Sequence, residues 1–419
     1  DGNNEKDGFT NFQFSGNLEV KVTKNFHLFA TGRYGESDTE FDIFGLPTGV
    51  MDGDDNTKSK DYSFDSGAKF FTVGDKFSGN IGVQKSNLNR NNLSNGLPSF
   101  SSEGSRTKIY GNGVIRTGIL DTILLGFESE KTETSGTFST LTHQKVNALF
   151  GHIQDEILPS LTITFGLRYD SFSTEAPTSL SSNKITYVNA SNRATNRTTL
   201  NYHFRNSDAI LRASFGTGFK TPSIFQTTFF CCGAKEVNPN LKPETSKGWD
   251  IGIEKLLSDN TTFHLSYHWQ SIENLIDFSF PDGGYLNISK AKTSGLEATI
   301  NYARDVFHMG MNYTYSKAIN VLLDSRLLRV PTHEIGLNIA YDISKVTSLG
   351  TSLIYRSDQL DINGKIEGAA VLDVRGSQRI SEYLEFYARI ENLLDQHYQT
   401  VFGYGTPGLS GYMGLRARF

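Results

Sequence analysis

The residues best suited to chemistry include an acidic run early in the chain. Asp52, Asp54 and Asp55 stand with Gly53 and Asn56 in the run DGDDN. Their carboxylate and amide oxygens are the hard ligands that Ca²⁺ prefers, and they predict a calcium site. The spacing is not that of an EF-hand, which needs a bidentate Glu at the twelfth loop position. A solvated acidic loop is the alternative interpretation.

The two cysteines of the chain, Cys231 and Cys232, are adjacent. They can form a strained vicinal disulfide, which suits an oxidising location outside the cell. Binding of a soft metal is the alternative, although two thiolates without a histidine close in sequence make an incomplete site. His264 and His268 share one face of a predicted strand and lack a third ligand, so ordinary polarity of an interior surface explains them.

Three aromatic residues, Phe225, Phe229 and Phe230, fall within one loop-like stretch. An exposed aromatic patch favours binding of a bulky, partly apolar ligand, and packing within the loop is the alternative. The sequence has no nucleophile elbow, P-loop, dinucleotide fingerprint or HExxH motif. We therefore predict no catalytic residue and no enzymatic activity.

A turn-rich segment follows the aromatic stretch and leads into a strand. Its residues are Asn238, Pro239, Asn240, Pro243 and Glu244. Proline fixes φ and asparagine accepts turn geometry, so the segment is suited to anchor a loop and set the register of the next strand. Direct contact of Asn238 and Asn240 with a ligand is the alternative.

The elements that must position these residues are strands. Segments of about 10 residues with alternating polarity recur along the chain. In the last of them, Leu409–Phe419, the apolar Met413, Leu415 and Ala417 alternate with two arginines. Short connections alternate with long ones rich in Ser, Asn, Gly and Asp, as tight periplasmic turns and long external loops do. We predict an all-β fold, a transmembrane antiparallel β-barrel in the bacterial outer membrane.

The long connections, in which external loops are expected, are Phe41–Lys60, Asn92–Ser105, Ser173–Ala194 and Phe225–Glu244.

Composition excludes two other classes. The 419 residues are 37% hydrophobic with a mean hydropathy of -0.36, and no run of about 18 apolar residues exists, which excludes a helical membrane protein. The net charge of -5 and the lack of a long basic run argue against a nucleic-acid partner.

Counting back from Phe419 gives about nineteen strands. The first, Phe9–Thr23, and the last both run inward. An odd number cannot close antiparallel, and bacterial single-chain barrels have even numbers, so we expect an odd number of strands to be missing before Asp1.

Several motifs resemble those of the TonB-dependent outer-membrane receptors. They are GFKTPSIFQ with NPNLKPETSKGWDIGIE, the segment YLNISKAKTSGLEATINY, and the ending IENLLDQHYQTVFGYGTPGLSGYMGLRARF. Within the family, the strand lengths and the ending look closest to the cobalamin receptors.

The resemblance implies a 22-stranded barrel around an N-terminal plug, energised by the TonB complex through that plug. Residues 1–419 would then be the barrel alone, without the plug and the first strands. It also implies that Phe419 is the signal for the barrel assembly machinery, and that Asp7 and Asp61 can join Asp52, Asp54 and Asp55 around calcium. Outer-membrane lipid and lipopolysaccharide are the expected surroundings.

The leading functional hypothesis is therefore import of a bulky nutrient, cobalamin or a related corrinoid. A ferric-siderophore receptor is the first alternative. A passive outer-membrane pore and a surface adhesion or phage-docking protein are alternatives of other classes.

Overall fold

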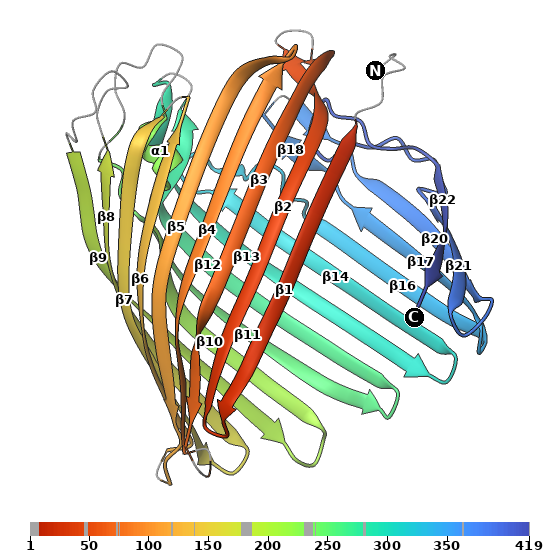
Figure 1. Cartoon of the computed structure of the whole chain (residues 1–419). Helices are drawn as coiled ribbons and strands as arrows, with labels where there is room; N and C mark the ends of the chain where they lie inside the picture. The colour runs from red at the N-terminus through yellow and green to blue at the C-terminus, as the bar shows by residue number, and fades with distance from the viewer. Residues whose placement is uncertain are drawn as a thin grey trace. The chain divides into compact units, whose positions relative to one another are not determined.

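The computed structural model describes residues 8–45, 49–72, 74, 76–118, 120–137, 139–176, 187–229, 238, 240–279, 282–362 and 364–418. Within these residues, twenty strands belong to one sheet and two more to a small separate sheet (Figure 1). Among the described residues, no helix has both the length and the apolarity needed to cross a membrane.

The strands are β1 Phe9–Thr23, β2 Phe26–Gly45, β3 Gly49–Phe71, β4 Phe77–Ser94, β5 Leu97–Ile115, β6 Thr122–Gly136, β7 Ser139–Leu158, β8 Leu161–Ala176, β9 Tyr187–Phe204, β10 Ala209–Lys220, β11 Glu244–Ser258, β12 Thr261–Ser279, β13 Gly284–Arg304, β14 Phe307–Asn320, β15 Ser325–Arg326, β16 His333–Ser344, β17 Thr347–Arg356, β18 Gln359–Asp361, β19 Gly364–Ile366, β20 Ala369–Arg379, β21 Leu384–Glu391 and β22 Ser410–Ala417. The helix α1 is Ile224–Thr228.

The predicted all-β antiparallel fold is confirmed. Of the twenty strands in the large sheet, β15 has two residues. The other nineteen have at least eight residues each, which is the number expected from the alternation of polarity. The first strand has the predicted bounds, Phe9–Thr23, and the last covers most of the predicted segment.

The chain forms two compact units. Unit 1 comprises Asp1–Thr199, Gly216–Lys247 and Ile272–Ser289, and unit 2 comprises Leu200–Phe215, Gly248–Ser271 and Lys290–Phe419.

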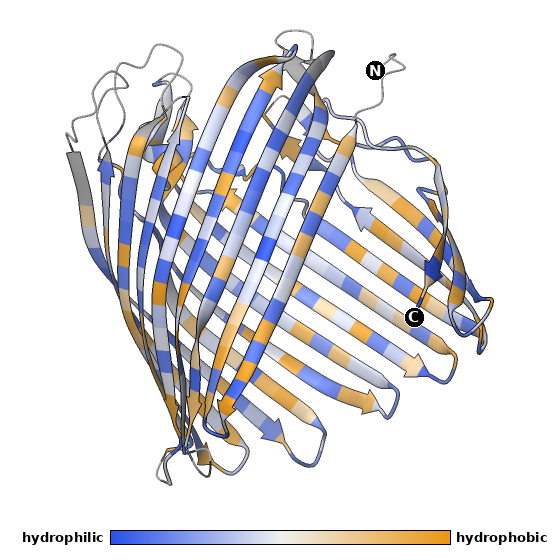
Figure 2. Ribbon diagram, in the orientation of Figure 1, coloured by the Kyte–Doolittle hydropathy of each residue, from blue (hydrophilic) through white to orange (hydrophobic). Residues whose placement is uncertain are grey.

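In unit 1, strands β1 to β8 form a meander in which each strand pairs antiparallel with the next. Side chains alternate between the two faces, and the ribbon accordingly alternates between hydrophobic and hydrophilic residues (Figure 2). On β1, Phe14, Leu18 and Val20 are exposed on one face, whereas Glu19 lies on the other and pairs with Lys69. We call these the apolar and the polar face of the sheet.

Two of the predicted long loops are wrong, because the strands continue through them. Residues 41–45 end β2 and residues 49–60 begin β3, whereas 92–94 end β4 and 97–105 begin β5. Asn95 and Gly96 make the turn between β4 and β5 with positive φ angles of 51° and 75°, as a tight hairpin requires.

Polar cross-strand pairs hold these extended strands together. Lys60 Nζ lies 3.0 Å from Glu36 Oε1, and the amide of Asn89 donates to Glu103 Oε1 at 2.7 Å. The polar residues that led to the loop prediction therefore lie on paired strands, which extend beyond the exposed apolar side chains of the apolar face.

In unit 2, β13 pairs with β14, and the ladder continues through β16, β17, β20, β21 and β22. The small β18–β19 hairpin is held by Asp361, whose side chain is 2% exposed. The guanidinium of Arg329 donates to both Asp361 oxygens at 3.1 and 3.0 Å, and the Phe402 amide donates to it at 2.9 Å. Arg329 and the backbone amides of Phe402 and Ile362 hold the pKa of Asp361 below its usual value.

Candidate ligand-binding site

A short helix begins the segment in which the sequence predicts ligand contact. Its N-cap is Ser223, whose hydroxyl accepts from the Gln226 amide at 3.1 Å while the Gln226 side chain accepts from the Ser223 amide at 2.9 Å. This capping box satisfies two amides that the helix itself leaves unpaired. Ile224, Thr227 and Thr228 are buried, so the helix presents Phe225 and Gln226 outward.

Phe225 and Phe229 lie one helical turn apart and stack with their ring centroids at 4.7 Å. Tyr285 at the start of β13 meets both rings, at 6.1 and 6.4 Å, and Phe278 at the end of β12 lies 6.1 Å from Phe229 and 5.3 Å from Tyr285. Phe225 is 47% exposed. We call these four rings the aromatic cluster. Such clusters combine a large apolar area with a specific ring geometry.

The sequence predicted Phe225 and Phe229, and the structure brings them together. It did not predict Phe278 and Tyr285, which lie about 50 residues further along and approach only because β12 and β13 form a hairpin. The Pro281–Gly284 turn signal next to these two aromatics was the available clue.

Asn238 fastens the loop to the same hairpin. Its side-chain amide donates to the Tyr285 carbonyl at 3.0 Å, and its side-chain oxygen accepts from the Asn240 amide at 3.0 Å. Leu241, which is 1% exposed, directly follows Asn240 in the chain. These bonds are those of a loop anchor, and they place Asn238 directly beside the aromatic cluster.

Asn287 and Glu244 complete the attachment. Asn287 accepts from the Lys242 amide at 2.8 Å, and donates to the carbonyls of Lys242 at 2.9 Å and Asn274 at 2.8 Å. Glu244 accepts from the Ile276 amide at 3.0 Å and lies 3.5 Å from Lys220 Nζ. Strand β11 begins at Glu244, the last residue of the turn-rich segment, so these bonds anchor the aromatic cluster to the start of a strand.

The polar face of unit 1 carries a charged network. Glu128 on β6 accepts from Lys108 at 2.6 Å and from Arg168 at 2.9 Å. The Arg168 side chain also donates to both oxygens of Asp170 at 3.0 Å, and the carboxylate of Asp170 is 3% exposed. The network connects β5, β6 and β8 on the polar face of the sheet.

Asp52, Asp54 and Asp55 lie within β3 and not in a loop. Asp61 lies on β3 as well, 4.0 Å from Arg33. Among the residues that the structure describes, no group of three or more His, Cys, Asp or Glu is placed to hold a metal ion.

Other predicted residues fall outside the described part of the chain: Asp7, Phe230, Cys231, Cys232 and Phe419. His268 on β12 lies 3.8 Å from the Glu297 carboxylate, and His264 shares its face four residues earlier.

Comparison with known proteins gives a family and a fold. The sequence model of the family described as TonB dependent receptor-like, beta-barrel matches residues 1–393. The ferric-catecholate import receptor Fiu from E. coli K12 superposes with a TM-score of 0.81 at 14% identity, over 99% of this chain and 75% of that one.

Two further solved structures are similar. The copper transporter OprC superposes with a TM-score of 0.83 at 15% identity, over 99% of this chain and 72% of that one. The siderophore receptor PirA from Pseudomonas aeruginosa gives 0.74 at 16% identity, over 98% of this chain and 71% of that one. At these identities the likeness concerns the fold.

Proposed function

Since the chain belongs to the TonB-dependent receptor β-barrel family, we propose that it is an outer-membrane receptor that imports an iron-carrying compound of the siderophore class. The observation that carries the proposal is the partly exposed aromatic cluster, anchored on a fixed base. A ferric catecholate presents flat aromatic rings, which stack on exposed aromatic side chains.

The relatives favour this ligand class over cobalamin. Two of the three solved relatives named above are receptors for iron-carrying compounds, one for a ferric catecholate and one for a siderophore. The corrinoid expected from the sequence gains no support from them. The proposal also includes three partners that the sequence resemblance implies: the plug domain, the TonB complex and the barrel assembly machinery.

Binding of a ferric catecholate to the full-length protein tests the proposal. The double variant F225A/F229A removes one stacked pair, and about 0.5–1.5 kcal/mol for each aromatic contact predicts an affinity loss of roughly tenfold. F64A is the matched control, because Phe64 is 48% exposed, close to the 47% of Phe225, but lies on the apolar face of β3.

Equal affinity of F225A/F229A and the wild type would contradict the placement of the site. Binding of cobalamin but of no ferric siderophore would contradict the ligand class. A steady open conductance of the full-length protein in planar bilayers would favour the passive pore instead.

A further inference from the structure

Gln226 follows the exposed Phe225 on α1, and its side chain is held in one orientation. The carboxamide of Gln226 accepts from the backbone amide of Ser223 at 2.9 Å, and the Ser223 hydroxyl accepts from the Gln226 amide at 3.1 Å. A backbone N–H can only donate, so the side-chain atom that faces it must be the oxygen Oε1. The Nε2 group, which carries two N–H donors, therefore points away from Ser223.

This Nε2 group has no partner within the part of the chain that the structure describes. Gln226 is half-buried, and Phe225 beside it is 47% exposed. The other three residues of the helix are buried, so these two form its outward side. A ring surface for stacking and a hydrogen-bond donor of known orientation are thus consecutive residues of the candidate site.

The neighbouring polar side chains cannot supply the same donor. The amide group of Asn238 donates to the Tyr285 carbonyl, and the Lys220 ammonium is paired with Glu244. The Tyr285 hydroxyl can both donate and accept, so it does not distinguish a donor on a ligand from an acceptor. Of these side chains, only Gln226 combines a free donor with a fixed polarity.

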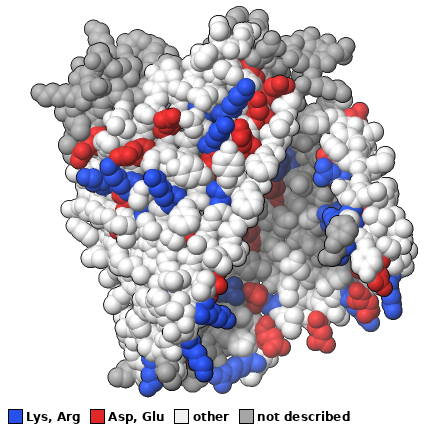
Figure 3. All heavy atoms as spheres, viewed as in Figure 1, with Lys and Arg blue, Asp and Glu red and all other residues white. Residues whose placement is uncertain are grey.

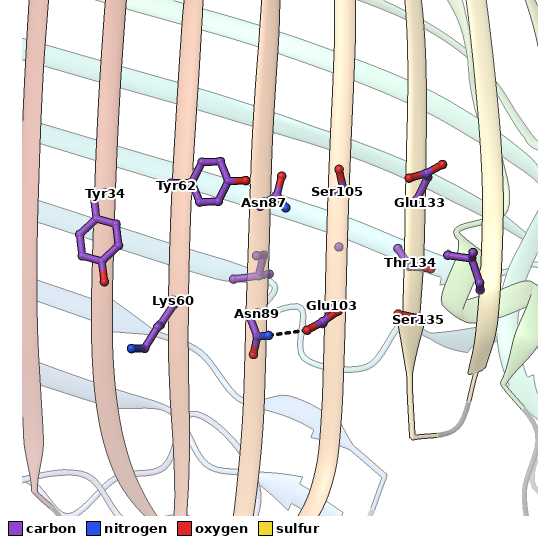
Figure 4. Close-up of a pocket in the computed structure, with 13 residues that line it drawn as sticks. Tyr34, Lys60, Tyr62, Asn87, Asn89, Glu103, Ser105, Glu133, Thr134 and Ser135 are labelled. Atoms are coloured by element: carbon purple, nitrogen blue, oxygen red, sulfur yellow. Dashed lines mark hydrogen bonds between the residues drawn. The ribbon is translucent and has the colours of Figure 1, made fainter.

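Elsewhere in unit 1, charged and polar groups already contact one another. On the face seen in Figure 3, basic and acidic side chains lie next to one another, and Lys60 pairs with Glu36. In the polar pocket of about 470 Å³ shown in Figure 4, the Asn89 amide donates to Glu103 at 2.7 Å. None of the cation–ring contacts among the described residues involves the aromatic cluster. Recognition at the aromatic cluster therefore depends on ring faces and uncharged polar groups.

An iron-bound catecholate suits this arrangement better than the same compound without iron. Its ring oxygens have exchanged their protons for iron(III), so they only accept, and hydrogen bonds to ionised acceptors are about twice as strong as neutral ones. In the iron-free compound at neutral pH, the same oxygens are hydroxyls whose protons need acceptors. Gln226 turns its donor group, and not its oxygen, toward a ligand on Phe225.

We propose that Gln226 is a specificity-determining residue. Its oriented Nε2 group donates to the oxygens of an iron-bound catecholate whose ring stacks on Phe225, and this bond selects the iron-loaded compound over the iron-free one. The inference rests on the proposed siderophore-receptor function and specifies the ligand of the same site.

The variant Q226E tests the proposal, because it keeps the cap and reverses the polarity toward the ligand. Glutamate also accepts from the N-cap amide in a capping box, so the free energy of unfolding should equal that of the wild type. The full-length protein is titrated with an iron(III) tris-catecholate and with the same tris-catechol free of iron. Loss of a hydrogen bond to a charged acceptor predicts roughly 10- to 100-fold weaker binding of the iron complex. Binding of the iron-free compound should change little.

Q399E is the matched control for the added charge. Gln399 in unit 2 has the same arrangement, since its Oε1 accepts from the Gly403 amide at 3.0 Å and its side chain is exposed. It lies outside the aromatic cluster, so both affinities of Q399E should equal those of the wild type. S223A is the control for the cap: it removes the hydroxyl acceptor but keeps the Gln226 donor, so both affinities should fall by the same factor.

Unchanged binding of the iron complex by Q226E, or equal losses for the iron-loaded and the iron-free compound, would overturn the proposal and leave Gln226 as a capping residue. If Q226E does not fold, Q226M removes the donor without adding a charge. Its affinity for the iron complex should fall further than its affinity for the iron-free compound, and equal losses would again overturn the proposal.

The variant F225A/F229A, measured in parallel, separates this inference from the proposed function. Affinity that is lost in F225A/F229A but retained in Q226E would refute the role of Gln226 alone. A wild-type protein that binds no ferric catecholate would refute the proposed ligand class, and the role of Gln226 with it.

Discussion

Replacing Arg168 by Gln should destabilise unit 1 by about 2–3 kcal/mol. Arg168 bridges Glu128 and the 3%-exposed carboxylate of Asp170. Removing one partner of a buried ion pair costs about 3–5 kcal/mol, because the other charge stays buried. Arg168 itself is 36% exposed, so water compensates part of that loss and the lower estimate applies.

Urea unfolding of the protein in lipid vesicles, extrapolated linearly to zero denaturant, measures the change. The double variant R168Q/D170N also removes the buried charge that R168Q leaves unpaired, so its free energy of unfolding should lie only about 1 kcal/mol below that of the wild type. R33Q is the control: Arg33 lies 4.0 Å from Asp61 with both side chains at least 40% exposed, so it should cost less than about 1 kcal/mol. An R168Q protein as stable as R33Q, or a double variant no better than R168Q, would refute this reasoning.

Three further predictions follow from the contacts. Arg329 holds the pKa of Asp361 below its ordinary value of about 3.9, so the ionised Asp361 stabilises the β18–β19 hairpin above that pH and the stabilisation is lost below it. In the wild type, limited proteolysis should therefore cut this hairpin faster only in that acidic range. D361N should be cut at pH 7 as fast as the wild type is cut in acid. L125R places a cation on the apolar face and should lower the unfolding free energy by about 2–4 kcal/mol, whereas L125I should change little. N287A removes three hydrogen bonds, so amide exchange at the start of β11 should accelerate by about two orders of magnitude, at about 1 kcal/mol per bond; unchanged exchange would contradict the anchoring role.

The sequence was most informative where one side of a strand meets an apolar environment. The bounds of β1 could be predicted because Phe14, Leu18 and Val20 alternate with polar residues and a short turn follows. The outer parts of β2 to β5 could not, because both their faces are polar and hydrophobic periodicity disappears. Their pairing depends on contacts such as Lys60 with Glu36, which join residues 24 positions apart.

The candidate site also has a part that the sequence predicts and a part that it does not. Phe225 and Phe229 are one helical turn apart, so their grouping is visible in the sequence. Phe278 and Tyr285 join them through a hairpin distant in sequence, and Asn238 reaches the Tyr285 carbonyl across 47 positions. The turn signal at Pro281–Gly284 marks the hairpin, but residue type and spacing do not show that it meets the helix or Asn238.

The neighbour-to-neighbour pairing of β1 to β8 also bears on how the protein forms. Each ladder joins strands that are consecutive in the chain, often across turns of two residues, such as those between β1 and β2 or β7 and β8. Closing such short loops costs little entropy, so every added hairpin can form on the edge left by the previous one. Each newly formed strand leaves its outer edge open only until the next hairpin adds to it, which limits the time during which the unpaired backbone groups of that strand are available for aggregation.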